Sequence, residues 1–137
     1  MTDATATPDF LSLDEVLDLH AEQLARFGGS PGVRDQRALE SAVATPQSTF
    51  DGQFLHDGVF KMAAAYAYHI AEAQAFVDGN KRTALNAALV FLDLNGWTVI
   101  DPEMRLYEAM IGFATHALDK DGMAQLLREL ASPLDSP

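Results

Sequence analysis

The sequence predicts an all-α fold, a single compact domain of about six helices packed around a buried central helix. Apolar residues recur at helical spacing through most of the chain. Capping residues, Gly and Pro punctuate these segments where helices are expected to begin and end. Trp97–Ile100 is the one strand-like stretch, and it is too short to found a sheet.

The first helices carry clear start and stop signals. Ser12 followed by Glu15 is a capping box, and Gly28 ends the helix that it opens. Asp35 is expected to cap a short second helix that ends before Pro46. A loop then leads to the third helix, which has apolar residues along one face. The six helices are expected at about residues 13–27, 36–45, 59–73, 80–94, 102–118 and 123–131.

The fourth helix is expected to be the buried one. From Ala84 to Leu94 it is apolar almost all round, which is typical of a helix enclosed on every side. It begins after a break at Gly79. Asp101 followed by Pro102 predicts the start of the fifth helix, because proline is favoured at the first helical position. A sixth helix closes the domain.

Length and composition indicate one domain. The chain has 137 residues, 48% of them hydrophobic, which is enough for a single core. The domain is expected over residues 10–131, with disordered tails at 1–9 and 132–137. The start lacks the basic and apolar regions of a signal peptide, and the longest apolar run, 87–92, is far too short to span a bilayer. We therefore expect a cytoplasmic protein.

The charge and the absence of cysteine exclude several function classes. Nine Lys and Arg against 20 Asp and Glu give a net charge of −11. Such a surface repels phosphate backbones and anionic lipids, so direct nucleic-acid and membrane binding are not expected. Without cysteine the chain has no disulfide, no thiolate zinc site and no cysteine nucleophile.

A local electrostatic conflict marks the candidate site. Lys81 and Arg82 fall in the first turn of the fourth helix, where cations oppose the helix dipole at a cost of about 0.3–1 kcal/mol each. An anion bound at the helix start would remove the conflict. Gly79 permits close backbone approach, Asn80 can cap the helix or bind a phosphate oxygen, and Asp78 is a carboxylate suited to Mg²⁺. The alternative is a capped helix whose cations reach solvent or nearby acids.

The segment QAFVDGNKRTA, residues 74–84, resembles the core motif of the Fic/Doc superfamily, and most closely its death-on-curing (Doc) branch. That motif reads His-x-Phe-x-Asp-Gly/Ala-Asn-Lys-Arg. The resemblance extends to the Gly-Gly-x-x-Gly-x-Arg-Asp stretch at residues 28–35 and to VFLDLNGW at 90–97, and it covers about residues 10–131. It implies the small six-helix fold that the helical pattern also predicts.

Two departures from Fic proteins that transfer AMP favour the Doc branch. Lys81 replaces a glycine of their Gly-Asn-Gly-Arg-x-x-Arg string, and Leu85 stands in place of its last arginine. In the Doc branch the resemblance implies transfer of the γ-phosphoryl group of ATP to a protein hydroxyl. Asp78 would hold Mg²⁺, Asn80 would orient phosphate, and Lys81 with Arg82 would neutralise charge on the transferred group. Phe76 would anchor the loop in the core.

Gln74 falls at the position of the motif histidine, which the resemblance identifies as the general base. Glutamine has no titratable group and cannot take the hydroxyl proton. General-base catalysis is worth typically about 10²–10⁴-fold, so turnover should fall heavily while binding survives. By helical geometry His69 faces away from position 74 and Glu72 lies on another face. We expect no substitute base from either. Gln74 is either the residue of a natural member with lost or altered activity or an inactivating substitution.

The predicted function is that of a Doc-type toxin of a toxin–antitoxin pair, which phosphorylates a Ser or Thr hydroxyl of a translation-machinery protein with ATP and Mg²⁺. AMP transfer is the alternative enzymatic reading, and Gln74 favours a non-catalytic nucleotide- or partner-binding protein. The chain lacks the inhibitory [Ser/Thr]-x-x-x-Glu-[Gly/Asn] string of self-regulated Fic proteins, so the expected regulator is a separate Phd-like antitoxin. His20 is expected to be a satisfied core or boundary residue, and Arg34 a partner of Asp35 or a substrate contact.

Overall fold

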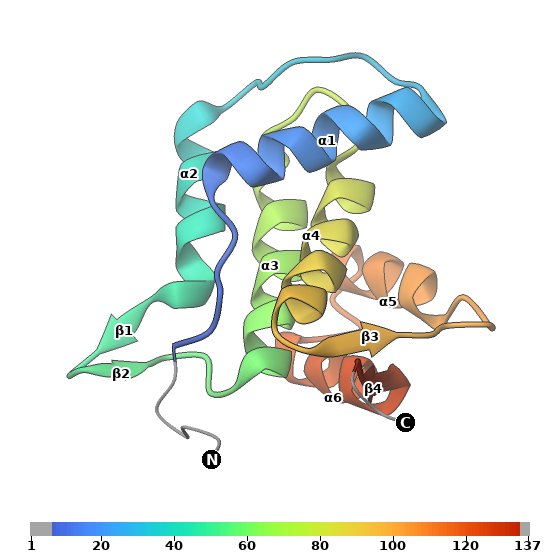
Figure 1. Cartoon of the computed structure of the whole chain (residues 1–137). Coiled ribbons are helices and arrows are strands. Elements are labelled where there is room, and N and C mark those ends of the chain that lie inside the picture. The colour runs from blue at the N-terminus through green and yellow to red at the C-terminus, as the bar shows by residue number, and fades with distance from the viewer. Residues whose placement is uncertain (1–6, 135–137) are drawn as a thin grey trace.

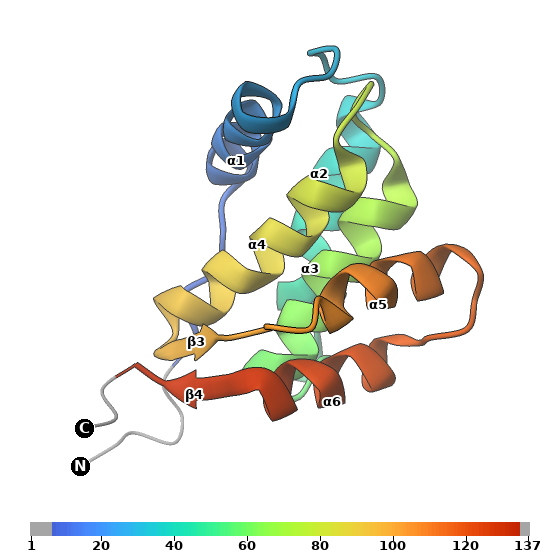
Figure 2. The same ribbon diagram turned by 90° about the vertical axis from the view of Figure 1, so that its right-hand side faces the viewer.

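Two antiparallel helices, α3 (Val59–Ala73) and α4 (Asn80–Leu94), form the centre of the computed structural model, which describes residues 7–134 (Figure 1). The other helices surround this pair, and α1 crosses one end of it (Figures 1 and 2). The all-α prediction is confirmed. The remaining helices are α1 (Leu13–Phe27), α2 (Gln36–Ala44), the 3-10 turn η1 (Thr45–Gln47), α5 (Arg105–Ala114) and α6 (Lys120–Leu130).

The central position is shared, and α3 is the more enclosed of the pair. A run of six consecutive buried residues, 62–67, contains four alanines, whose small side chains let neighbours pack on every side of α3. The sequence predicted this role for α4 alone. However, α4 buries one face and leaves Asp93 and Leu94 exposed at its end. A continuous apolar run thus overstated its burial.

Caps of α1 and α2 confirm the sequence signals. The Ser12 hydroxyl accepts from the Glu15 N–H at 3.1 Å, and the Glu15 carboxylate accepts from the Ser12 N–H at 2.9 Å. The Asp35 carboxylate accepts from the Ala38 N–H at 3.0 Å at the start of α2. Each bond satisfies a donor that a helix start leaves without a partner.

The bounds of α5 differ from the prediction. Asp101 caps the helix, but it does so across a turn: its carboxylate accepts from the N–H groups of Arg105 and Leu106 at 2.9 and 2.8 Å. Pro102 therefore lies in that turn rather than at the first helical position. The helix ends at Ala114, because His116 adopts a left-handed conformation with φ of 62°. Helix α6 begins earlier than predicted, with Asp119 as its cap.

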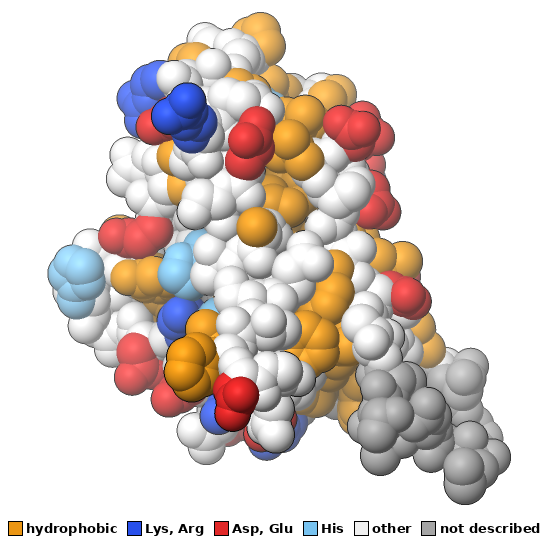
Figure 3. All heavy atoms as spheres, turned by 90° about the vertical axis from the view of Figure 1, so that its left-hand side faces the viewer, with side chains coloured by type: hydrophobic (Ala, Val, Ile, Leu, Met, Phe, Trp, Pro, Cys, Tyr) orange, Lys and Arg blue, Asp and Glu red, His pale blue; other side chains and the backbone are white. Residues whose placement is uncertain are grey.

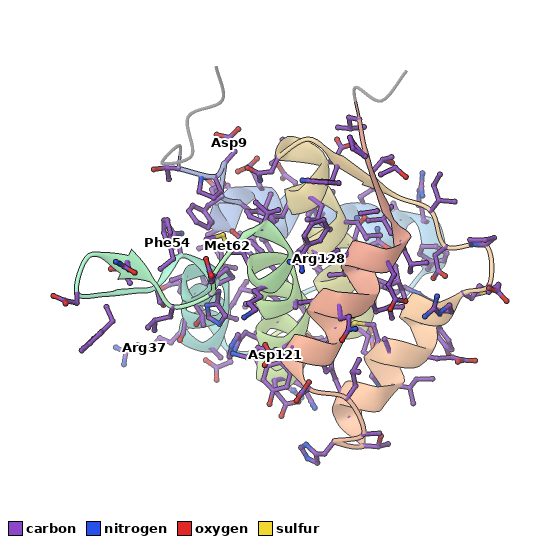
Figure 4. The ribbon with its side chains drawn as sticks, turned by 90° about the horizontal axis from the view of Figure 1, so that it is seen from below. Asp9, Arg37, Phe54, Met62, Asp121 and Arg128 are labelled. Atoms are coloured by element: carbon purple, nitrogen blue, oxygen red, sulfur yellow. The ribbon has the colours of Figure 1, made fainter. Side chains whose placement is uncertain are left out.

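Two small sheets were not predicted. Within the expected loop, β1 (Thr49–Phe50) and β2 (Gln53–Phe54) form a hairpin whose turn is Asp51-Gly52, with both residues left-handed. The hairpin projects to one side of the helices (Figure 4). The second sheet pairs β3 (Trp97–Val99) with β4 (Ala131–Pro133) in antiparallel register.

The domain extends past both of its predicted limits. Ser132 and Pro133, expected in the C-terminal tail, belong to β4, and the Leu134 N–H donates to the Gly96 carbonyl at 2.9 Å. At the other end the backbone of Asp9 exchanges two hydrogen bonds with the Asn95 amide, at 2.9 and 3.0 Å. Residues 1–6 and 135–137 of the two predicted disordered tails lie outside the described residues.

The surface agrees with the composition. On the face in Figure 3 acidic side chains are scattered and basic ones are few. Arg128 of α6 lies toward α3 in Figure 4, with its guanidinium 5.2 Å from the Phe60 ring centroid. Across residues 7–134 no helix is both long enough and apolar enough to cross a membrane.

A cluster of three basic groups joins α6 to α3. The Lys120 ammonium donates to Nε2 of His69 at 3.0 Å and to Nε2 of His56 at 3.2 Å. Burial first, then the charges of Lys120 and His56, lower the pKa of His69 to about 4. Burial and Lys120 also lower the pKa of His56. Both rings are therefore neutral acceptors at pH 7.

We expect this cluster to make folding stability depend on pH. Unfolded His69 binds a proton near its ordinary pKa of 6.5, whereas the folded ring binds one only near pH 4. The contribution of His69 to the free energy of unfolding is therefore fully present above pH 6.5 and is lost as the pH falls toward 4. Urea unfolding between pH 7 and 4.5 should show a smaller loss of unfolding free energy for His69→Asn than for the unmodified protein. Carboxylates titrate in both proteins, so equal losses would contradict the assignment.

Candidate active site

A cavity of about 420 Å³ opens at the start of α4, beside the turn that joins α3 to α4. Every residue that the sequence assigned to the site lies on its wall. The lining is completed by Ala71 of α3, Val77 of the turn and Tyr107 of α5. The predicted residues are Gln74, Asp78, Gly79, Asn80, Lys81 and Arg82.

The turn is held by the connection between α1 and α2. The two segments lie together at one end of the molecule in Figure 2. Val33 and Phe76 form an antiparallel bridge, and the Ala75 carbonyl accepts from the N–H groups of Arg34 and Asp35 at 2.6 and 3.1 Å. The Arg34 guanidinium donates to the Gln74 carbonyl at 2.7 Å. Arg34 thus fixes the turn and does not pair with Asp35, which caps α2.

Asn80 closes the turn from the other side. Its side-chain oxygen accepts from the Phe76 N–H and its amide nitrogen donates to the Phe76 carbonyl, both at 3.0 Å. Phe76 is fully buried, as the sequence predicted for an anchor. With both amide atoms engaged, Asn80 in this structure is a clamp on the turn rather than a cap of α4.

Asp78 and Gly79 make the step from the turn into the helix. The Asp78 carboxylate accepts from the Ser30 N–H at 2.8 Å through one oxygen, which leaves the other oxygen available. Gly79 is left-handed, with φ of 80°, a conformation that costs other residues about 1–2 kcal/mol. The glycine therefore lets α4 begin with its N–H groups at the cavity wall.

Electrostatics at the start of α4 favour an anion. The first turn has no acidic residue, and no side chain caps the helix. Lys81 and Arg82 are exposed. Within residues 7–134 the single ion pair joins Arg105 and Glu129, so neither cation is neutralised by an acid there. Arg82 instead lies 4.4 Å from the centroid of the Phe27 ring. Unpaired cations beside helical N–H donors are the chemistry of phosphate sites.

Gln74 ends α3 in a left-handed conformation and is exposed at the cavity. It also borders an adjoining cavity of about 170 Å³, together with Lys81, Glu72 and His116. The sequence placed Glu72 on another face of α3, but the left-handed turn at Gln74 brings both residues to one wall. His69, by contrast, belongs to the cluster around Lys120.

His20 is the site residue whose role sequence analysis missed. It is buried, as expected, but its ring stacks on Phe76 at a centroid distance of 3.7 Å, and its Nε2 lies 2.8 Å from the Asp78 carbonyl oxygen. The only signal in the sequence was a polar residue on the inner face of α1. Periodicity identifies such a position but not its partner.

Comparisons with known proteins find sequence similarity along most of the chain. A sequence model described as the Fic/DOC family matches residues 10–92. The chain is 36% identical over 121 residues to "Protein kinase doc" of Escherichia phage P1, an alignment that covers 88% of this chain and 94% of the relative. It is 38% identical over 127 residues to "Toxin Doc" of Mycolicibacterium smegmatis, covering 90% and 95%.

Replacing Asn80 should loosen the turn. We expect Asn80→Ala to lower the free energy of unfolding by about 1–3 kcal/mol, because the Phe76 N–H and carbonyl both lose their side-chain partner. Urea denaturation measures the change. Asn86→Ala, on the same helix and also part-buried, is the matched control and should change stability by less than about 0.5 kcal/mol. Equal losses in the two variants would contradict the clamp.

Proposed function

Because the chain belongs to the Fic/DOC family, we propose that it is a Doc-type toxin acting in the cytoplasm. Its reaction transfers the γ-phosphoryl group of ATP to a Ser or Thr hydroxyl of a translation-machinery protein. The observation that supports this proposal best is the cavity at the start of α4, where Lys81 and Arg82 stand without acidic partners beside uncapped helical N–H groups. The names of the two relatives, one a protein kinase and one a toxin, point the same way.

The residues of the cavity suit phosphoryl transfer. The hydroxyl oxygen would bond to the γ-phosphorus while the bond from that phosphorus to the β–γ bridging oxygen breaks, leaving ADP. Positioning and charge neutralisation do most of the catalytic work in this reaction. Lys81, Arg82 and the N–H groups of α4 would hold the triphosphate and neutralise its charge. The turn that carries them is bonded on both sides, so the donors are preorganised.

Asp78 fits the magnesium ion that the proposal requires. One carboxylate oxygen accepts from Ser30, and the other is available at an exposed position on the cavity wall. The described residues contain no group of three or more His, Asp or Glu placed to hold a metal. Mg²⁺ is commonly held by one or two carboxylates together with substrate phosphates. Asp78 would therefore hold it jointly with ATP, and bound Mg²⁺ would offset phosphate charge.

Gln74 limits the reaction. The hydroxyl proton must leave as the new bond forms, and an amide cannot accept it. We propose that nucleotide binding is intact in this chain and that turnover is impaired. AMP transfer is the competing reaction, in which the α-phosphoryl group moves instead. Lys81 and Leu85 disfavour it.

A separate antitoxin is the proposed regulator. An amphipathic, Phd-like segment with basic residues on its polar rim would complement the charge of −11. Phe27 and Val33 are exposed at the end of α1 and in the connection that follows, which supports a docking surface beside the cavity. Co-purification with the product of an adjacent small open reading frame tests the partner, and hydrogen exchange tests the surface.

Lys81→Ala/Arg82→Ala should weaken binding of ATP with Mg²⁺ at least about tenfold, because two charged donors are lost from the phosphate end. Titration calorimetry measures the dissociation constants. Arg37→Ala/Lys61→Ala removes the same charge at exposed positions outside the cavity and should leave binding unchanged. If the two double variants bind alike, the site assignment is wrong.

Gln74→His should restore turnover by about 10²–10⁴-fold, since it supplies a general base at the cavity wall. Radioactive label from [γ-³²P]ATP should then appear on a protein of a cell lysate, while [α-³²P]ATP should leave none. Gln74→Asn keeps the amide and serves as the control. Label from the α position would assign the protein to AMP transfer.

A further inference from the structure

We infer that His20 is a positioning residue for the part of the cavity at the start of α4, where phosphate would bind. It orients the peptide between Asp78 and Gly79. This inference rests on the proposed function, because it concerns the donors that would bind the triphosphate. His20 belongs to α1, far in sequence from the turn, and it does not line the cavity. It acts from behind the wall.

Two contacts and one close approach place the imidazole against Phe76, Asp78 and Gly79 of the turn. The ring stacks on Phe76, with centroids 3.7 Å apart and planes inclined by 8°. Nε2 lies 2.8 Å from the carbonyl oxygen of Asp78. A Cβ atom at Gly79 would lie 3.6 Å from both Cδ2 and Nε2 of the same ring. The side chain is 6% exposed, so water does not replace these contacts.

The hydrogen bond fixes the direction of a donor. A carbonyl oxygen only accepts, so Nε2 carries the proton in this contact. In a trans peptide the carbonyl and the following N–H point in opposite directions, and the described residues contain no cis peptide. Holding the Asp78 carbonyl on His20 therefore aims the Gly79 N–H away from the His20 ring. Gly79 lines the cavity and His20 does not, so we infer that this N–H is turned toward the cavity.

The imidazole of His20 combines two properties that phenylalanine and glutamine supply singly, a flat ring and an N–H donor. Phenylalanine retains the flat ring for Phe76 but leaves the Asp78 carbonyl without its donor. Glutamine retains an N–H donor but loses the stack. A residue with a purely structural role would need only the ring, because Phe76 is apolar. The pair of substitutions therefore separates positioning from packing.

The experiment compares His20→Phe, His20→Gln and a control, Gln23→Leu. Gln23 is the other buried polar residue of α1. Readouts are thermal melting, calorimetry with ATP and Mg²⁺, and amide hydrogen exchange at Gly79. We expect His20→Phe to melt within a few degrees of the unmodified protein, to bind about tenfold more weakly, and to exchange the Gly79 amide faster. His20→Gln should retain more affinity for ATP than His20→Phe. Gln23→Leu should change neither the affinity for ATP nor the exchange of the Gly79 amide.

Unchanged affinity and unchanged Gly79 exchange in His20→Phe would overturn the inference. Nitrogen-15 NMR of the unmodified protein provides a test that needs no variant, since a neutral His20 protonated on Nδ1 instead of Nε2 is incompatible with the bond to Asp78. The proposed function fails separately, if the unmodified protein does not bind ATP. In that case the exchange and NMR results still decide whether His20 orients the peptide.

Discussion

The burial of Phe76 is the constraint on which the rest of the site depends. Its ring is fully enclosed and stacked on His20, and its backbone N–H and carbonyl are both bonded to Asn80. With this residue fixed, the chain has only Val77, Asp78 and Gly79 in which to reach the first turn of α4. The position of the helix start, and of the cations on it, follows from one apolar side chain in the core.

Charge explains why a small acidic protein has a basic site. With 20 acidic residues against nine basic ones, most of the surface disfavours anions, and long-range attraction for a nucleotide is weak. Affinity for phosphate must then come from short-range donors held in place before the ligand arrives. The bonds from Arg34, Ser30 and Asn80 to the turn supply that order. The geometry of these donors thus supplies the affinity for phosphate that the net charge of the protein does not.

The sequence predicted the helices and the composition of the cavity because both depend on local patterns. Capping at Ser12 and Asp35, the break at Gly79 and the unusual cations of α4 are all visible within a few residues. The partner of His20 and the pairing of β3 with β4 depend on contacts between distant segments, which periodicity does not encode. The hairpin at Asp51-Gly52, in contrast, does have a local signal, because Asp-Gly favours a two-residue hairpin turn. The sequence predicted that Asn80 binds phosphate. Its hydrogen bonds to the backbone of Phe76 appear only in the folded structure.

The two ends of the described chain meet at the far end of α4. Asp9 is bonded to Asn95, and Leu134 to the neighbouring Gly96. The helix has 15 residues, so this junction stands about 20 Å from the cavity. A domain joined at Asp9 or at Leu134 would attach at this junction and leave the mouth of the cavity clear. A short linker between the ends would likewise yield a circular permutant in which α3, α4 and their turn stay uninterrupted.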